Sequence, residues 1–316
     1  MGELRAHILS GCKYIRTITL HNITVIGENA FQYCRNLETV IIPETVTKIG
    51  RNAFAYSGLK SIILPDGLTE IGERAFYGCR NLKIVVIPKT VTKINPEAFA
   101  DSGLKSIILP HGLTEIGEGA FYGCHKLETV VIPETVNEID LYAFAHSGLK
   151  SIILPYQSNG LTKIKEGVFR YCSNLETVDI PKTVTEIDRC AFADSGLKSI
   201  NLPHGLTEIG DYGFNSCYNL ETVVIPKTVT KINSYAFAHS GLKSITLLDG
   251  RLTEIGSGTF YKCNSLEIMI IPETVTKIGP RAFGYSGLKS ITLPRGVKIG
   301  EDAFNNCHNL VVEYRN

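Results

Sequence analysis

The sequence places a thiol directly beside an imidazole at Cys124 and His125, within the stretch FYGCHKLETV (residues 121–130). Such a pair can be two metal ligands, an activated nucleophile with its base, or two neighbours with no chemical role. The chain contains nine cysteines and eight histidines, and a reactive or metal-binding set among them would need a defined spacing.

The cysteines follow a repeated pattern rather than a reactive one. Eight of them occupy the same position of a repeat, mostly in every second repeat: Cys12, Cys34, Cys79, Cys124, Cys172, Cys217, Cys263 and Cys307. Two repeats along a parallel stack are roughly 9–10 Å apart, beyond the limit of about 7 Å between Cα atoms for a disulfide. Only Cys12 and Cys34 fall in adjacent repeats, where a bridge is geometrically possible. We expect the other members of this column to be small buried thiols, and Cys190, outside the column, to be a partly exposed thiol.

The histidines and the remaining motifs also predict no chemistry. No C-x-x-C, Gly-rich phosphate loop, HExxH or nucleophile–base–acid set is present. His146 could approach His125 on one rim of the fold, but two histidines alone make a weak zinc site. His111 and His204 share one repeat position and His146 and His239 another, which duplication explains. The sequence therefore predicts no catalytic residue, no metal ligand and no cofactor, hence a protein that is not an enzyme.

The cysteines and histidines lie within internal repeats of the sequence. LKSIILPDGLTEIGERAFYGCRN (59–81) and LKSIILPHGLTEIGEGAFYGCHK (104–126) are nearly identical. Repeats begin at Ile15, Leu37, Leu59, Leu82, Leu104, Leu127, Leu149, Leu175, Leu197, Leu220, Leu242, Leu266, Leu288 and Leu310. Their spacing is 22 or 23 residues, except for 26 after Leu149 and 24 after Leu242. A fixed period of this length is typical of a solenoid, in which each repeat buries its apolar side against its neighbours.

The shared pattern is L-x-x-I-x-[LI]-P-x-x-[LV]-T-x-I-x-x-x-A-F followed by a turn. In LKSIILP (59–65), Ile62 and Leu64 share the inner face of a short strand, while Ser61 and Ile63 take the outer face. Pro65 has no amide donor and ends that strand. Later in the repeat, the spacing of Ala75, Phe76 and Cys79 is compatible with a helical turn. Gly or Asn precedes almost every leading Leu, and we expect a left-handed backbone there.

The pattern L-x-x-I-x-L-P-x-x-L-T-x-I-G-x-x-A-F-x-x-C resembles the BspA-like, or Treponema-type, leucine-rich repeats over essentially the whole chain. The resemblance implies a leucine-rich repeat solenoid, mostly β with short helical turns, of about 13 units. It further implies a curved right-handed coil with a parallel sheet on its concave face. Members of this family are surface proteins of bacteria and of some parasitic protists, and several are implicated in adhesion. The resemblance thus implies a location at the cell surface or in the secreted fraction.

We expect one domain over residues 1–316. Residues 1–14 match only the tail of a repeat, and residues 310–316 form a last strand. Glu313 and Arg315 are expected at its interior positions, where they would make a polar cap. After each leading Leu, charge alternates from Lys105 onward through Glu128, Lys150, Glu176, Lys198, Glu221, Lys243, Glu267 and Lys289, so opposite charges should face each other on neighbouring strands.

Composition excludes two partner classes. The formal net charge is +1, which provides no field to attract nucleic acid. No run of about 18 apolar residues exists, so no membrane insertion is expected. The N-terminus lacks the basic start and apolar core of a signal peptide, although a leader could have been removed beforehand.

The solvent face of the concave strands is the first candidate binding surface. Its central column contains Ile41, Ile63, Val86, Ile108, Val131, Ile153, Asp179, Asn201, Val224, Thr246, Ile270 and Thr292. A ridge of β-branched apolar residues exposed to solvent suggests a contact surface. The alternative is that these residues reflect only the β-propensity of a flat face.

A second candidate lies where the repeat is interrupted. The repeat beginning at Leu149 carries the longer turn PYQSNG, with Tyr156, Gln157 and Asn159, and the following strands bring Asp179 and Asn201 into the central column. An inserted aromatic and polar loop beside a polar notch favours specific recognition. Slippage during repeat duplication, without functional consequence, is the alternative.

These observations predict a non-enzymatic protein-binding module, a surface or secreted adhesion protein that engages host or microbial proteins such as extracellular matrix or cell-surface proteins. Two other interpretations stay open: a structural spacer that self-associates through its sheet face or open end, and an intracellular scaffold.

Overall fold

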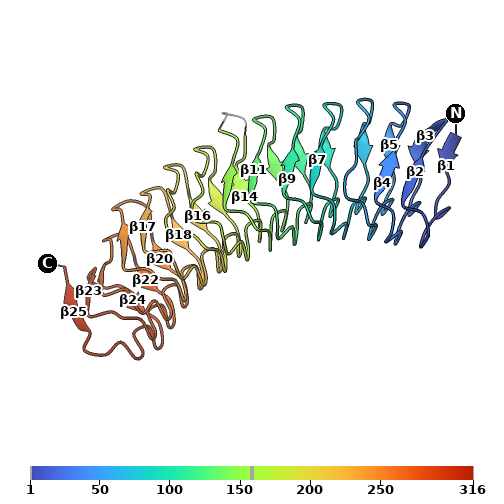
Figure 1. Cartoon of the computed structure of the whole chain (residues 1–316). Helices are drawn as coiled ribbons and strands as arrows, with labels where there is room; N and C mark the ends of the chain where they lie inside the picture. The colour runs from blue at the N-terminus through green and yellow to red at the C-terminus, as the bar shows by residue number, and fades with distance from the viewer. Residues whose placement is uncertain (1, 157–159, 316) are drawn as a thin grey trace. The chain divides into compact units, whose positions relative to one another are not determined.

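The structure is a computed structural model, and it describes residues 2–156 and 160–315. The chain divides into two compact units, Met1–Pro155 and Tyr156–Asn316, here called the N-terminal and C-terminal units. Within each unit the chain winds through successive short coils that stack through parallel strands (Figure 1). The expectation that all 316 residues form one domain stays a prediction.

The first strand of each coil follows the leading Leu. In the N-terminal unit these strands are β2 (Thr17–Thr19), β4 (Thr39–Ile41), β7 (Ile84–Val86), β9 (Ser106–Ile108), β11 (Thr129–Val131) and β13 (Ser151–Ile153). In the C-terminal unit they are β17 (Thr222–Ile225), β19 (Ser244–Leu247), β21 (Ile268–Ile270), β23 (Ser290–Leu293) and β25 (Val311–Tyr314). They pair in parallel at equivalent repeat positions, as in the pairing of Val130 with Ile152. The predicted parallel sheet is confirmed.

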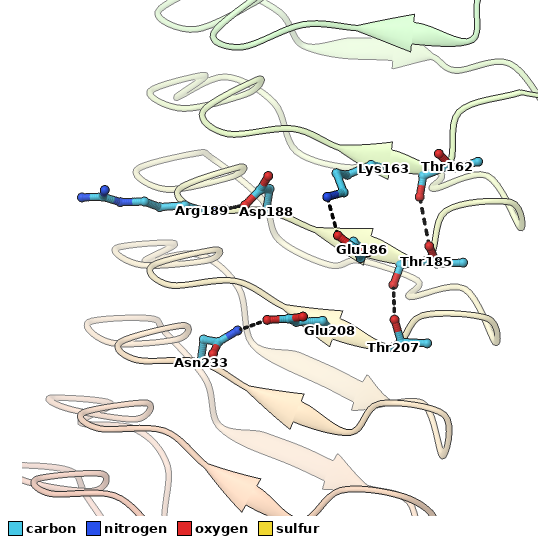
Figure 2. A network of polar contacts seen from close by, with 9 residues as sticks. All are labelled: Thr162, Lys163, Thr185, Glu186, Asp188, Arg189, Thr207, Glu208 and Asn233. Carbon is cyan, nitrogen blue, oxygen red and sulfur yellow. Dashed lines mark hydrogen bonds and ion pairs between the residues drawn. The ribbon is translucent and has the colours of Figure 1, made fainter.

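A second strand follows the next turn of each coil, which contains a proline in most repeats. The N-terminal unit has β1 (Gly2–Leu4), β3 (Ile23–Ile26), β5 (Lys48–Ile49), β6 (Glu70–Ile71), β8 (Lys93–Ile94), β10 (Glu115–Ile116) and β12 (Glu138–Ile139). The C-terminal unit has β14 (Lys163–Ile164), β15 (Glu186–Ile187), β16 (Glu208–Ile209), β18 (Lys231–Ile232), β20 (Glu254–Ile255), β22 (Lys277–Ile278) and β24 (Lys298–Ile299). Figure 2 shows how the outer residues of β14, β15 and β16 join their coils: Lys163 pairs with Glu186, and the Thr207 hydroxyl donates to the Thr185 carbonyl.

The core of each unit is a set of columns, because every coil repeats the same inner positions. Ile62 and Leu64 are buried while Ile63 is 84% exposed, which confirms the predicted strand alternation. The buried phenylalanines stack within each unit with ring centroids 5.1 to 5.8 Å apart. Burial of these rings supplies much of the apolar area that one coil could not bury alone.

The predicted helical turn is wrong, since no helix occurs among the described residues. Each coil instead closes with two left-handed residues four positions apart, as at Arg74 (φ 56°) and Gly78 (φ 65°). Between them the amides alternate in direction. The Phe76 N–H donates to the Ala98 carbonyl of the next coil at 2.8 Å, whereas the Ala75 N–H donates back to Gly72 at 3.1 Å. Half of the amides thus join neighbouring coils, which the internal bonds of a helix would not permit.

The expected left-handed backbone before each leading Leu is also wrong, except at Asn309. Glycine is needed there because another backbone lies too close for a side chain. A Cβ atom on Gly58 would lie 2.1 Å from the Arg35 carbonyl oxygen, and one on Gly103 would lie 2.0 Å from that of Arg80. Corners of the type Cys-x-x-Leu, which we call wide, therefore alternate with narrow corners of the type Ser-Gly-Leu. This alternation accounts for the spacings of 22 and 23 residues.

The cysteine column is confirmed as a packing feature. All nine cysteines are free thiols, and Cys12 and Cys34 are not bridged. The Cys124 thiol donates to the Phe99 carbonyl at 3.1 Å, and its sulfur lies 3.4 Å from the Ser102 hydroxyl of the preceding narrow corner. The prediction for Cys190 is wrong, because this residue is buried and only 8% exposed.

The predicted polar cap is wrong as well. Strand β25 pairs Ile291 with Val312 and Leu293 with Tyr314, so these apolar residues take the inner register. Glu313 lies opposite Thr292, in the outer register. The last repeat enters its strand pairing one residue earlier than the others, because Val311, directly after Leu310, pairs with Ser290, which lies two residues after Leu288. Counting from Leu310 therefore assigns the wrong face to Glu313 and Arg315.

Candidate functional site

The outward row of the first strands in the N-terminal unit is an uninterrupted apolar column. It consists of Ile41, Ile63, Val86, Ile108, Val131 and Ile153, and we call it the apolar ridge. All six are exposed, from 53% at Ile41 to 84% at Ile63. Their exposure follows from the strand alternation, because Val40, Val85, Ile107, Val130 and Ile152 beside them in the chain are buried.

Strand pairing brings the members of the ridge together. Val86 pairs with Ile108 and Val131 pairs with Ile153 in parallel register, and β9 lies against β11. Adjacent members are therefore separated by about one strand spacing of 4.8 Å. Five residues predicted to bind a partner, Ile63, Val86, Ile108, Val131 and Ile153, thus occupy one column of one unit.

Sequence reasoning missed Ile84, which widens the ridge. Ile84 lies on β7, two residues before Val86, on the same face, and is 55% exposed. Most other repeats place Ser or Thr at this position, as at Ser61 and Ser106, and an exception in the C-terminal unit is the exposed Ile268. The sequence LKIVVIP (82–88) already contains this difference, because Ile84 stands where most repeats have Ser or Thr.

One margin of the outward face is charged, as predicted. Lys150 pairs with Glu128 at 2.9 Å in the N-terminal unit, and Lys198–Glu176, Lys243–Glu221 and Lys289–Glu267 pair at 2.6 to 2.7 Å in the C-terminal unit. Lys60 pairs with Glu38 at 2.8 Å, and its hydrogen bond lowers the pKa of that carboxyl group. Each of these exposed pairs favours the in-register stack only weakly.

The C-terminal unit carries a mixed version of the same column, with polar residues beside the exposed Val224 and Ile270. Asp179 and Asn201 are exposed and pair through a parallel bridge, and Thr246 and Thr292 follow further along the unit. Tyr156 is exposed, and partial burial together with the negative charge of Asp179 raises the pKa of its hydroxyl. The structure therefore brings Tyr156, Asp179 and Asn201 into one neighbourhood. Gln157 and Asn159, the other predicted residues of this loop, lie outside the described residues.

The neighbouring residues Cys124 and His125 differ in exposure: the thiol is buried and the imidazole is exposed. Burial raises the pKa of the Cys124 thiol to about 12, so it stays protonated and unreactive near neutral pH. His125 is exposed on the corner. His146 contacts Tyr122, with ring centroids 5.1 Å apart. In the described part of the chain, no three His, Cys, Asp or Glu side chains gather as they would around a metal ion.

Short coils, two parallel strands per coil and a columnar core define the class: a leucine-rich repeat solenoid. The family profile described as BspA type leucine rich repeat region matches residues 2–105, 92–220 and 185–311. The chain belongs to this family, whose members are generally non-enzymatic scaffolds that bind other proteins.

Solved structures agree. A leucine-rich repeat protein from Bacteroides ovatus is 27% identical with a TM-score of 0.77, over 100% of this chain and 88% of that one. A leucine rich cell surface protein from Faecalibacterium prausnitzii is 26% identical with a TM-score of 0.53, over 100% of this chain and 83% of that one. Comparison with curated proteins gives no match. Nowhere in residues 2–156 and 160–315 is there a helix with the length and apolar character needed to cross a membrane.

Proposed function

We propose that this chain is a non-enzymatic protein-binding module that engages a partner protein through the apolar ridge. The single observation that carries the proposal is the uninterrupted run of six exposed β-branched residues at one position of successive coils, four of them on the paired strands β7–β9 and β11–β13. Water must be displaced from such a surface on contact, and burial of apolar area favours association by about 25 cal/mol per Å² before the costs of ordering.

The surroundings of the ridge support a protein partner. A column of Ser and Thr runs beside the ridge, and the charged margin lies beyond it, so an apolar centre has polar neighbours on one side. This is the composition of protein interfaces, in which an apolar core is bordered by a polar rim. The rigid sheet beneath the ridge also lowers the entropy cost of binding, because the side chains are already fixed in register.

Tyr156, Asp179 and Asn201, together with Gln157 and Asn159, form the second recognition surface in this proposal. An exposed phenol beside a carboxylate and an amide offers hydrogen bonds of defined direction. Such groups select among partners that the apolar ridge alone would accept.

We further propose that the module acts at the cell surface or after secretion, as an adhesion protein. The support is the family and the similarity to the F. prausnitzii protein, which is described as a cell surface protein. The partner class that fits is an extracellular matrix or cell-surface protein of a host or another microbe.

Binding to immobilised matrix proteins and to intact cells tests the proposal. Ile63, Ile108 and Ile153 would each be replaced with Lys, which keeps the exposed positions soluble but charges the ridge. We expect the triple variant to fold as wild type and to lose at least roughly tenfold in affinity, since charge at an interface core is strongly disfavoured. Unchanged binding would remove the ridge from the partner site.

Self-association is the competing function, and the same ridge on two copies could support it. Multi-angle light scattering over a hundredfold range of concentration distinguishes the two. A monomer at all concentrations supports a heterologous partner. A concentration-dependent dimer that the triple Lys variant abolishes would instead assign the ridge to self-assembly.

A further inference from the structure

A second surface of the N-terminal unit lies where each coil turns into its first strand. The wide corners place one extra residue there, as at Arg35 and Arg80, while the narrow corner between them has only Gly58. The glycine cannot be replaced by a larger residue, because the Arg35 carbonyl fills the position of its missing side chain. The corner therefore alternates between projecting side chains and recesses.

Two hollows in the surface lie along this corner. One, of about 370 Å³, lies between Arg35 and Arg80 over Gly58 and Gly78, with Tyr56 in its lining. A second, of about 480 Å³, lies between Lys13 and Arg35 and is lined also by Tyr33 and Asn36. The two hollows share Arg35 as a wall. Lys13 and Arg35 lie on adjacent coils, whereas Arg35 and Arg80 lie two coils apart with the narrow corner at Gly58 between them.

The charge of this corner is one-sided. The wide-corner residues and the residue after each leading Leu include nine basic and two acidic side chains in the N-terminal unit. The basic ones, all exposed, are Lys13, Arg16, Arg35, Lys60, Arg80, Lys83, Lys105, Lys126 and Lys150, and we call them the basic corner. The acidic ones are Glu38 and Glu128, each paired with a lysine. A net positive field therefore remains along the whole corner.

Three of the projecting basic side chains form no ion pair among the described residues. The ion pairs among the described residues of this unit use Lys48, Arg51, Lys60, Arg74, Lys93 and Lys150. Lys13, Arg35 and Arg80 take part in none of these pairs. Their charged groups are available to a ligand without breaking an internal contact.

The C-terminal unit provides an internal comparison, because the same positions there carry no net charge. They hold three lysines and three glutamates, all in the pairs Lys198–Glu176, Lys243–Glu221 and Lys289–Glu267. A hollow of about 570 Å³ exists beside Tyr218 and Gly241, but its lining includes the Glu221–Lys243 pair. The repeat alone therefore produces hollows, and the excess of cations is particular to the N-terminal unit.

We infer that the basic corner binds a linear anionic polysaccharide, one bearing sulfate or carboxylate on every second sugar. Arg35 and Arg80 lie two coils apart, roughly 9–10 Å from strand spacing, so charges on the ligand must recur at that interval. An extended acidic peptide repeats its side chains on one face every ~6.7 Å, which does not fit this interval. A stiff chain with a charge on alternate sugars does, and its uncharged sugars would enter the hollows.

The chemistry of the corner suits such a ligand. Guanidinium groups hold carboxylate and similar oxyanions through two parallel hydrogen bonds. Tyr33 and Tyr56, stacked with ring centroids 5.0 Å apart, line the hollows. Asn36 donates to the Lys13 carbonyl at 2.6 Å, which holds two wide corners in fixed relation. Binding is electrostatic and therefore weakens with added salt.

The test uses the full chain and, as the probe, a hyaluronan octasaccharide, which carries a carboxylate on every second sugar, with affinity measured by isothermal titration calorimetry at several salt concentrations. We expect binding in 150 mM NaCl, and a loss of roughly tenfold or more in the variant R35A/R80A, because two charge-assisted contacts are removed. The control is K198A/K243A, which removes two exposed lysines that follow the leading Leu of their coils in the C-terminal unit. We expect its affinity to stay within about twofold of wild type.

Circular dichroism and thermal melting would establish that both variants fold. Three results would overturn the inference: no binding of the octasaccharide by wild type, an equal loss in both variants, or equally tight binding of a polyglutamate peptide of the same charge. The last result would show that any polyanion, including an acidic protein segment, suffices. Loss of octasaccharide binding in R35A/R80A with unchanged binding to the partner of the apolar ridge would separate the two surfaces.

Discussion

The two units share one interior and differ in what they present to solvent. Both stack their phenylalanine rings at 5.1 to 5.8 Å and repeat the same parallel strand pairing. On the outward strand face, the N-terminal unit has six consecutive apolar residues, whereas the C-terminal unit interrupts the column with Asp179, Asn201, Thr246 and Thr292. The corner is basic in the first unit and neutral in the second.

The comparison shows which positions the fold constrains. A core ring must match its neighbours above and below, so every coil keeps Phe there. An outward residue has no such requirement and can change from Ile to Asp without cost to the stack. A surface property that is confined to one unit therefore cannot be explained by the repeat, and the apolar ridge and the basic corner are the properties of this kind.

The prediction with the largest expected effect tests whether the cores of the two units are packed in the same way. Phe76 and Phe237 are fully buried, each stacked between two other rings. Replacing either with Ala should lower the free energy of unfolding by about 3–5 kcal/mol, because burial and a cavity are both involved. Chemical denaturation measures the loss, and Tyr218→Ala, at an exposed position, is the control. Losses that differ strongly between the two units would contradict a shared core.

The next effect tests the alternation of wide and narrow corners. Gly103→Ala in the N-terminal unit and Gly241→Ala in the C-terminal unit would each bring a Cβ atom to 2.0 Å from a carbonyl oxygen. We expect each to destabilise the protein by about 1–3 kcal/mol, since the backbones must move apart.

Matched controls for this pair exist in the same units. A Cβ atom on Gly112 or Gly205 would meet its nearest neighbour at 3.5 Å, an ordinary contact. Gly112→Ala and Gly205→Ala should change the melting temperature little. If all four variants melt alike, close backbone approach is not the reason for glycine at the narrow corners.

The third prediction concerns pH and applies equally to both units. Burial raises the pKa of Cys79, Cys124 and Cys217 from 9.0 to about 12. The unfolded chain releases these protons near pH 9, while the folded chain retains them until about pH 12. Stability from these thiols is therefore complete below pH 9 and is lost as pH rises from 9 to 12. Unfolding in denaturant at pH 8 and pH 10.5 measures the decline.

The control replaces Cys124 and Cys217 with Ala, which should make the decline shallower although the variant is less stable at every pH. An undiminished decline would assign the effect to other groups. Alkylation gives an independent check: in the folded protein we expect the half-buried Cys12 and Cys307 to react before the seven buried thiols.

The prediction with the smallest expected effect gives the N-terminal unit the charge pattern of the C-terminal unit at one position. Lys83 and Lys105 interrupt the alternation of charge in the N-terminal unit. Lys83→Glu would place an acid between Lys60 and Lys105, as in the C-terminal unit. We expect a gain of about 0.2–0.5 kcal/mol in stability at low salt and none at high salt. A gain that persists in 1 M salt would show that charge is not its cause.

The sequence predicted the solenoid, the parallel strands, the buried thiols and the charge pairs, because these follow from alternation and period. It failed where a feature depends on a neighbouring coil. Gly58 is set by the Arg35 carbonyl, and the turn at Arg74 by amides that point to the next coil; neither contact lies within one repeat. Counting residues from Leu310 also assigned Glu313 to the wrong face of the last strand. The ridge was visible in the sequence, but its exposure and the hollows of the basic corner required three dimensions.

The most direct test of the central claim compares matched triple variants of the two units against one partner. In the N-terminal unit, Ile63, Ile108 and Ile153 become Lys. In the C-terminal unit Val224, Thr246 and Ile270, from the same column, become Lys as well. We predict that the first variant loses at least roughly tenfold in affinity for the partner identified with wild type, while the second stays within a few-fold. An equal loss in both, or a greater loss in the C-terminal variant, would contradict the assignment of binding to the apolar ridge.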